Sequence, residues 1–220
     1  MKKLIALFAA LSSIAAAQVT TELTAGYRSK DFSFGKVAST VSAYTTTADI
    51  RINSFRLGTS VQDQLTLKSS KLYQLDLIGG YKFFSSLADV EFGTRYVTKG
   101  IFAKYDMKNH WRPFVEVSKG IFSVRSQMDL EAKTSNIEGA LKRALPLGAG
   151  FKFTPSVYVG YTDANDALPH TIKEIKYTNV YYGGSGDVSW KWATAGLYTI
   201  HTKIDKKYTN GYRAGVALKF

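Results

Sequence analysis

Apolar and polar residues alternate along most of this chain, and the alternation is clearest in the segment Tyr212–Phe220. The even positions of this segment hold Tyr, Ala, Val, Leu and Phe, whereas its odd positions hold Arg, Gly, Ala and Lys. Successive side chains of a β-strand point to opposite faces, so this segment is predicted to be a strand with one apolar face. Helix-period patterns are weak throughout the chain.

The same period of two predicts an all-β protein of about twelve antiparallel strands, with ten as the alternative count. The predicted strands are Val19–Arg28, Lys36–Tyr44, Ala48–Leu57, Tyr73–Phe83, Asp89–Tyr96, Trp111–Ser118, Phe122–Glu131, Ile137–Leu145, Phe151–Thr162, Tyr182–Trp192, Thr194–Thr202 and Tyr212–Phe220. An even number of strands is typical of single-chain barrels in bacterial outer membranes. No linker or low-complexity segment divides these strands, so one domain is expected.

The predicted connections alternate between short and long. The short ones lie near Thr45–Thr47, Ser85–Leu87, Lys119–Ile121, Pro146–Gly150 and Ala193. The longer ones are Ser29–Gly35, Gly58–Ser70, Thr98–His110, Ala132–Asn136, Asp163–Lys176 and Lys203–Asn210. Short periplasmic turns and longer outer loops are the asymmetry of a closed transmembrane β-barrel, which is the fold we predict.

Aromatic residues gather at both ends of the predicted strands, on the apolar face. Those at the long-loop end are Tyr27, Tyr73, Tyr96, Trp111, Tyr161, Tyr182 and Tyr212. Those at the short-turn end are Phe83, Phe122, Phe151, Trp190, Trp192 and Phe220. Two aromatic girdles around an apolar band are favoured at the two interfaces of a bilayer, so the apolar face is expected to contact lipid.

The first residues have the features of a secretory signal peptide. Lys2 and Lys3 precede the apolar run Leu4–Leu11, and small residues at Ala15–Ala17 form a cleavage site. The run is shorter than the about 20 apolar residues that span a bilayer. We therefore expect a signal peptide at 1–17, a transmembrane barrel domain at 18–220, and a location in the bacterial outer membrane.

A soluble exported sandwich or lipocalin-like barrel is the alternative fold. Its apolar face would point inward and its polar face would be the outer surface. Mixed charges in the middle of the polar faces, such as Glu91 with Arg95, fit either fold. The aromatic girdles and the terminal Phe220 favour the membrane barrel.

The chain has 29 lysines and arginines against 17 acids, a net charge of +12, and no cysteine. A basic balance favours anionic partners. Export argues against nucleic acid, which leaves outer-membrane lipid, the phosphates of lipopolysaccharide, and small polar or anionic solutes as the expected partners. Lysines in the predicted loops, such as Lys203, Lys206 and Lys207, carry much of the excess charge.

The alternating Tyr212–Phe220 terminus and the girdles resemble those of Gram-negative outer-membrane β-barrels. That resemblance implies that Tyr212 and Phe220 form the signal read by the barrel assembly machinery. The chain is also similar to the TorF-type porins at Gly26–Lys30, in the strand Tyr73–Tyr81 and at Tyr181–Gly184. It departs from that family at Phe34-Gly35, where an Arg-Gly motif after the aromatic is missing.

The charged residues on the polar faces are the candidate pore lining. They are Arg28, Asp76, Lys82, Glu91, Arg95, Arg112, Glu116, Arg125, Asp129, Glu138, Lys142, Lys152, Asp187 and Arg213. In an open lumen these side chains would set the ion preference of a porin-like channel for small polar or anionic solutes. If opposite charges pair across the lumen instead, the barrel is closed, and its basic loops bind lipopolysaccharide or an external partner. The strand count fits both alternatives.

The sequence gives little support to catalysis. His110 and His170 fall in predicted outer loops and His201 lies near a strand end, and no serine lies at a recognisable spacing from them. The acids Asp163 and Asp166 near His170 match no calcium-loop spacing. We expect no enzymatic activity, no cofactor and no metal site.

Overall fold

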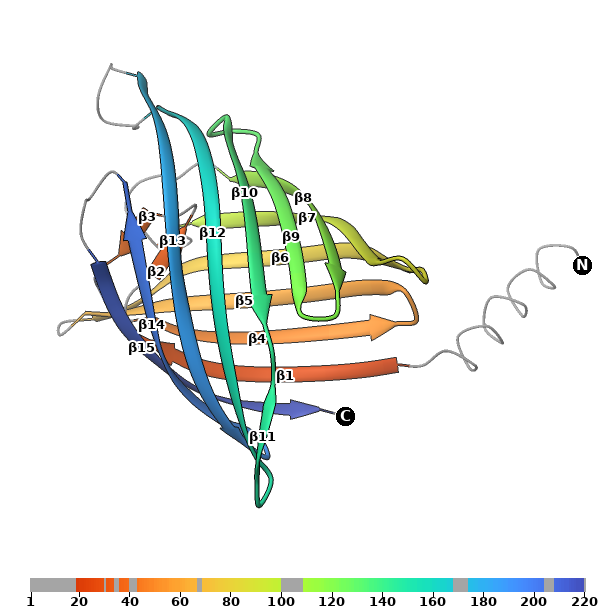
Figure 1. Ribbon diagram of the computed structural model, residues 1–220. Coiled ribbons are helices and arrows are strands. Elements are labelled where there is room, and N and C mark those ends of the chain that lie inside the picture. Colours follow the sequence, from red (N-terminus) through yellow and green to blue (C-terminus); the bar gives the residue numbers. More distant parts are fainter. Residues whose placement is uncertain are drawn as a thin grey trace, which may run out of the picture.

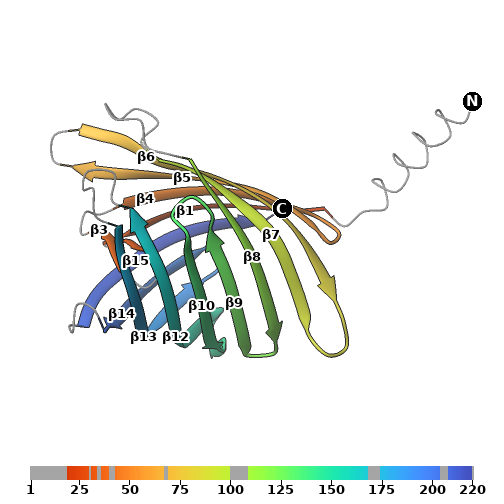
Figure 2. The same cartoon turned by 90° about the horizontal axis from the view of Figure 1, so that it is seen from above.

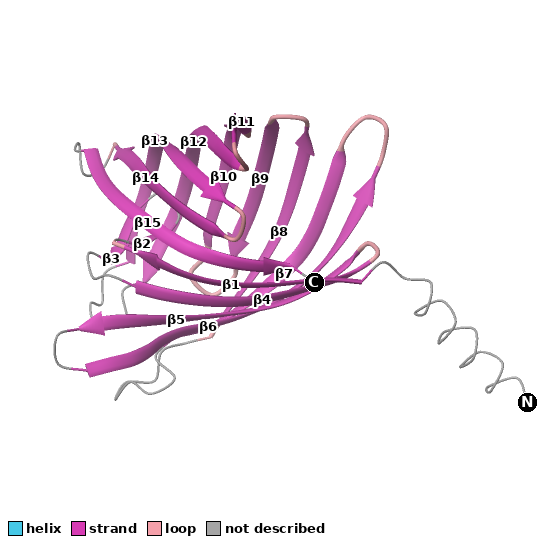
Figure 3. Ribbon diagram, turned by 90° about the horizontal axis from the view of Figure 1, so that it is seen from below, coloured by secondary structure: helices cyan, strands magenta, loops and turns pink. Residues whose placement is uncertain are grey.

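The computed structural model describes residues 19–29, 31–33, 36–39, 43–66, 69–99, 109–167, 174–203 and 208–219, and in these ranges it consists of β-strands joined by turns (Figures 1 and 3). The strands are β1 Val19–Arg28, β2 Asp31–Ser33, β3 Lys36–Ser39, β4 Ala43–Ile52, β5 Phe55–Thr66, β6 Ser69–Phe84, β7 Asp89–Lys99, β8 His110–Lys119, β9 Phe122–Asp129, β10 Thr134–Lys142, β11 Leu145–Gly148, β12 Phe151–Ala167, β13 Glu174–Trp190, β14 Ala193–Thr202 and β15 Tyr208–Lys219. In the described residues, no helix has both the length and the apolar character needed to cross a membrane.

Twelve of these strands form a closed ring. Consecutive strands pair antiparallel from β4 through β10, and β12 through β15 continue the series. The ring closes where β1 pairs with both β4 and β15. The short β11 prolongs β10 after a break at residues 143–144, and both strands pair with β12. The predicted fold, a closed antiparallel barrel of about twelve strands, is therefore confirmed.

The two rims of the barrel differ in their connections. On the rim where β1 begins and β15 ends, hairpins turn in as few as two residues, as at Asn53-Ser54 and Lys191-Trp192. On the opposite rim, residues 100–109 separate β7 from β8, and residues 168–173 separate β12 from β13. The small β2–β3 hairpin lies at this long-loop rim (Figure 2). These connections confirm the predicted division into short turns and longer loops, but β5 and β6 are separated by residues 67–68 alone, where a longer loop was predicted.

The predicted strand boundaries between residues 36 and 66 are wrong. Lys36–Tyr44 was predicted to be one strand of the barrel wall. Residues 36–39 instead pair only with β2, and β4 begins at Ala43. The predicted strand Ala48–Leu57 contains a hairpin turn, where Asn53 adopts a φ of 53°. The predicted turn Thr45–Thr47 lies within β4, and most of the predicted loop Gly58–Ser70 belongs to β5. A single Asn, which tolerates the left-handed region, sets this turn without Gly or Pro beside it.

The apolar faces point outward, away from the lumen. Leu197 is 70% exposed and Val157 55%, whereas the buried apolar residues in the described part are Val97, Phe114, Tyr181, Tyr198 and Ile200. A soluble barrel would bury its large apolar side chains. The contiguous outward apolar surface instead fits a hydrocarbon environment, as predicted for a membrane barrel.

Aromatic side chains meet in pairs at both rims of this outer surface. At the long-loop rim Tyr27 contacts Tyr44 and Tyr212, with ring centroids 5.2 and 5.7 Å apart, and Tyr96 contacts Trp111. At the short-turn rim Phe151 stacks on Trp190 at 5.8 Å. The side chain of Tyr73 and all of Phe220, which were assigned to the girdles, lie outside the described residues, as does the predicted signal peptide.

Candidate functional site: the charged lumen

The barrel encloses a cavity of about 770 Å³ that is lined by side chains from most of the ring. Its charged lining residues are Arg28, Arg95, Arg112, Arg125, Glu138, Lys142 and Arg213. All seven belong to the set that the sequence proposes as pore lining. Six of them are cationic and one is acidic, so the wall of the cavity is far more positive than the nearly balanced set predicted from sequence.

Several acids absent from this lining are held against the barrel wall by basic partners. Arg56 on β5 donates to Asp49 on β4 at 2.6 Å and to Glu91 on β7 at 2.9 Å. Arg51 lies 3.6 Å from both carboxylates. Charge-assisted hydrogen bonds of this kind fix both partners, so these carboxylates are neutralised within the wall.

Three further carboxylates have basic partners. Asp187 on β13 accepts hydrogen bonds from Arg213 on β15, one of them 2.7 Å from Nε. Asp129 on β9, only 1% exposed, accepts from Arg112 Nε at 2.8 Å. Lys82 lies 3.1 Å from Asp89 near the short-turn rim. Each of these pairs joins strands that are adjacent in the ring or separated by one strand, so none of them crosses the lumen.

Arg95 and Arg125 each have a guanidinium nitrogen that no side chain or backbone group in the described part of the chain neutralises. The Nε of each is buried and has no hydrogen-bond partner within the described residues. The carboxylate of Asp76 lies 3.7 Å from Arg95 Nη1, beyond hydrogen-bond length, and its Oδ1 accepts from Gln74 at 2.6 Å. Arg125 stacks on the ring of Phe114, with its Cζ 4.7 Å from the ring centroid. Such stacking orients a guanidinium without cancelling its charge.

Tyrosines occupy the wall formed by β12, β13 and β14. Tyr181 donates from its hydroxyl to Glu138 and accepts from Asn136, at 2.8 and 2.9 Å. Tyr158 donates to the Thr199 carbonyl at 2.8 Å. Together with Tyr198 these rings line the same cavity as the arginines. The lumen therefore has guanidinium groups from β7, β8 and β9 and aromatic rings from β12, β13 and β14.

The remaining predicted residues lie on the inner face or at a rim. Glu116 pairs in register with Arg125, and Lys152 is exposed near the short-turn rim. A pore-lining role for the predicted set stays a prediction, as does the assembly role of Tyr212, which is exposed at the long-loop rim. Sequence reasoning missed Asp49, Arg51 and Arg56 because the β4–β5 turn was not recognised.

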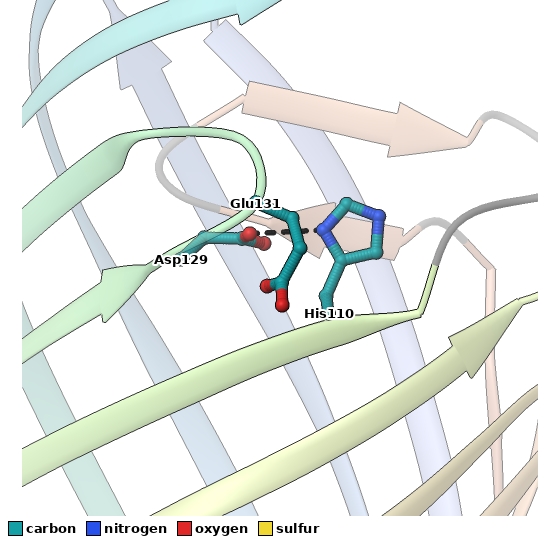
Figure 4. A group of neighbouring side chains, drawn as sticks. All are labelled: His110, Asp129 and Glu131. Carbon is teal, nitrogen blue, oxygen red and sulfur yellow. Dashed lines mark hydrogen bonds and ion pairs between the residues drawn. The ribbon is translucent and has the colours of Figure 1, made fainter.

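The structure also brings together three side chains for which no joint role was predicted. His110 at the start of β8, Asp129 at the end of β9 and Glu131 just after it have potential ligand atoms within 4.8 Å of one another (Figure 4). His110 Nδ1 lies 2.9 Å from Asp129 Oδ1. The signal was present in the sequence: Asp129 and Glu131 are two residues apart and so share a strand face.

Solved porin structures resemble this barrel. The KdgM porin matches with a TM-score of 0.61 at 14% identity, over 90% of this chain and 99% of that chain. The NanC porin matches with a TM-score of 0.55 at 13% identity, over 91% and 100%. A structure of the KdgM porin in complex with disordered oligogalacturonate matches at 0.54 and 11%, over 91% and 99%. No protein-family model and no curated protein matches the sequence.

The fold is thus that of the Gram-negative outer-membrane β-barrels, as the alternating terminus and the girdles predict, and it resembles that of the KdgM and NanC porins. At these sequence identities the likeness concerns the fold. The similarity to the TorF-type porins rests on the quoted segments alone and stays a prediction.

Proposed function

We propose that this protein is an outer-membrane channel for the passive diffusion of small polar solutes, with a preference for anions. The lumen carries the proposal: six cationic side chains and a single acid line a cavity of about 770 Å³, and two of the six, Arg112 and Arg213, are paired with Asp129 and Asp187 behind the lining. Rings of charged side chains set the selectivity of a pore, and fixed positive charge raises the local concentration of anions.

The arrangement of the ion pairs supports an open lumen. Asp49, Glu91 and Asp187 pair with arginines of nearby strands, so these pairs lie along the wall and leave the space between opposite walls free. A barrel closed by charge pairing would need pairs that cross the lumen. The alternative of a closed structural barrel therefore has less support from the described residues.

Acidic sugars are the solute class that the lumen suits best. A sugar ring offers an apolar face that stacks on tyrosine, and a carboxylate accepts bidentate hydrogen bonds from arginine. Tyr158, Tyr181 and Tyr198 share the cavity with the arginines. One of the matched porin structures is a complex with an oligogalacturonate, which is an acidic sugar of this class.

Conductance in planar bilayers tests the proposal. The purified, folded protein is expected to give open-channel steps and a reversal potential of anion-selective sign across a potassium chloride gradient. Replacing both Arg95 and Arg125 by Gln should shift that potential toward cation selectivity. Lys119→Gln is the matched control, because Lys119 is an exposed cation at the short-turn rim outside the cavity lining.

Folded protein that gives no conductance steps would refute the channel. The alternative function, a surface-interaction barrel whose basic loops bind lipopolysaccharide, would then be tested by binding to lipopolysaccharide. Lys203 of these loops is exposed, whereas Lys206 and Lys207 lie outside the described residues. The absence of enzymatic activity stays an expectation.

A further inference from the structure

We propose that His110, Asp129 and Glu131 form a binding site for a divalent transition-metal ion, of which Zn²⁺ is the best candidate, at the long-loop mouth of the lumen. The site is independent of conduction, because it rests on three side chains at the rim. Among the described residues, these three are the histidine and acidic side chains whose potential ligand atoms converge (Figure 4).

The register of two strands produces the convergence. β8 and β9 pair with Phe114 opposite Gln127, and the Leu130 amide donates to the Trp111 carbonyl at 3.0 Å, which continues the ladder toward the rim. The same register places His110 opposite Glu131, with Asp129 on the diagonal. Cross-strand and diagonal neighbours on one face are within reach of each other's side chains.

Both carboxylates are oriented by donors behind them. Asp129 Oδ2 accepts from Arg112 at 2.8 Å, and the Ala132 amide donates to Oδ1 at 3.0 Å. Glu131 Oε2 accepts from the Trp111 amide at 2.6 Å. Carboxylates that bind metals are commonly held by such outer hydrogen bonds, which fix their orientation.

The net charge around His110, Asp129 and Glu131 favours the binding of a cation. Two other carboxylates of the inner wall, Asp49 and Asp187, have arginine partners. Glu131 has no cationic partner among the described residues, and the single arginine on Asp129 is Arg112. The two carboxylates outnumber the one arginine, so these groups carry a net negative charge in a lumen that is otherwise positive.

The donor set selects the kind of ion. One imidazole nitrogen with two carboxylates suits Zn²⁺ and related transition metals, whereas Ca²⁺ and Mg²⁺ prefer oxygen ligands throughout. Metal–ligand bonds of about 2.0–2.1 Å in a tetrahedral site put ligand atoms roughly 3.4 Å apart. The present spacing of up to 4.8 Å needs only a small rotation, which the exposed Glu131 side chain can supply.

To bind the ion, the ring nitrogen that faces Asp129, Nδ1, must offer its lone pair, so the ring would carry its proton on Nε2. The ion would then join the start of β8 to the end of β9 at the mouth.

Calorimetric titration of the full chain in detergent with zinc chloride tests the site. We expect one zinc ion bound per chain. His110→Ala and Glu131→Gln should each weaken binding roughly tenfold or more, since even outer donors to a metal site are worth 10–100-fold. Cobalt absorption spectra should change in the same variants.

His201→Ala is the matched control, because His201 lies on the outer face, where its ring stacks on Tyr182 at 4.9 Å. This variant should bind zinc like the unchanged chain. No binding, or equal binding by the His110→Ala variant, would overturn the proposal and leave the trio as a hydrogen-bonded cluster. Conductance is not needed for either result, so failure of the metal site is distinct from failure of the channel.

Discussion

At the scale of single residues, glycines on neighbouring strands let the lumen tyrosines lie flat against the wall. A Cβ added to Gly160 would overlap the ring of Tyr181, and one added to Gly183 would overlap Tyr158. The missing side chain gives each ring a place on the wall, where the Tyr181 hydroxyl also meets Glu138. Small residues therefore keep these large rings from filling the pore.

Gly160→Ala should displace the Tyr181 ring into the lumen. We expect a loss of about 1–3 kcal/mol in the free energy of unfolding, from overpacking and from the broken hydroxyl bond. Urea unfolding in detergent, followed by tryptophan fluorescence, measures this. Gly139→Ala is the control, because a Cβ there meets nothing within 4 Å. Equal stability of the two variants would show that the ring–glycine contact contributes little.

At the scale of elements, the β4–β5 hairpin decides which charges face the lumen. Its two-residue turn at Asn53-Ser54 pairs Arg51 with Arg56 and Asp49 with Gly58. This register brings Arg56 within reach of Asp49 on the neighbouring strand and of Glu91 on β7, two strands away along the wall. A slip of one residue would send this charge cluster to the lipid face.

Asn53→Val should destabilise this hairpin. A β-branched side chain at the φ of 53° costs roughly 1–2 kcal/mol relative to Asn or Gly. The fraction of chain that refolds into detergent micelles, read from the heat-dependent gel mobility of the barrel, should fall for this variant. Asn53→Gly should refold like the unchanged chain, because Gly adopts this conformation freely. A Val variant that refolds equally well would mean that the turn is not what sets the register.

The same hairpin shows how far sequence reasoning reaches. Period-two alternation locates strands well where Gly or a run of polar residues marks the turn, as at Gly120. It fails between residues 36 and 66, where apolar and polar residues continue through the Asn53 turn. Alternation also predicts that Arg95 and Glu91 face the lumen, but it does not predict which side chains they pair with. Pairing depends on register between strands, which one sequence does not contain.

At the scale of the whole molecule, the fold places acidic and basic side chains in different parts of the inner surface. Acids and bases are nearly balanced on the inner face, but the wall holds the acids in pairs while arginines such as Arg95 and Arg125 reach the cavity. The field inside the barrel is therefore set by geometry more than by composition.

The anion preference should consequently depend on ionic strength. Raising the salt from 0.1 M to 1 M shortens the Debye length from about 10 Å to about 3 Å, which screens fixed charges across an aqueous lumen. We expect the ratio of anion to cation permeability to fall markedly over this range, as measured by reversal potentials at a constant salt ratio. A ratio that does not change would indicate selection by close contact with the arginines.

The closure of the ring has a consequence for assembly. β1 and β15, near opposite ends of the chain, form the seam, with Glu22 paired to Lys219. Hydrocarbon offers no hydrogen-bond partners, so a half-built sheet with two bare edges is unstable there. The pairing of β15 with β1 is therefore the step that removes the last bare edges and makes the sheet stable in hydrocarbon.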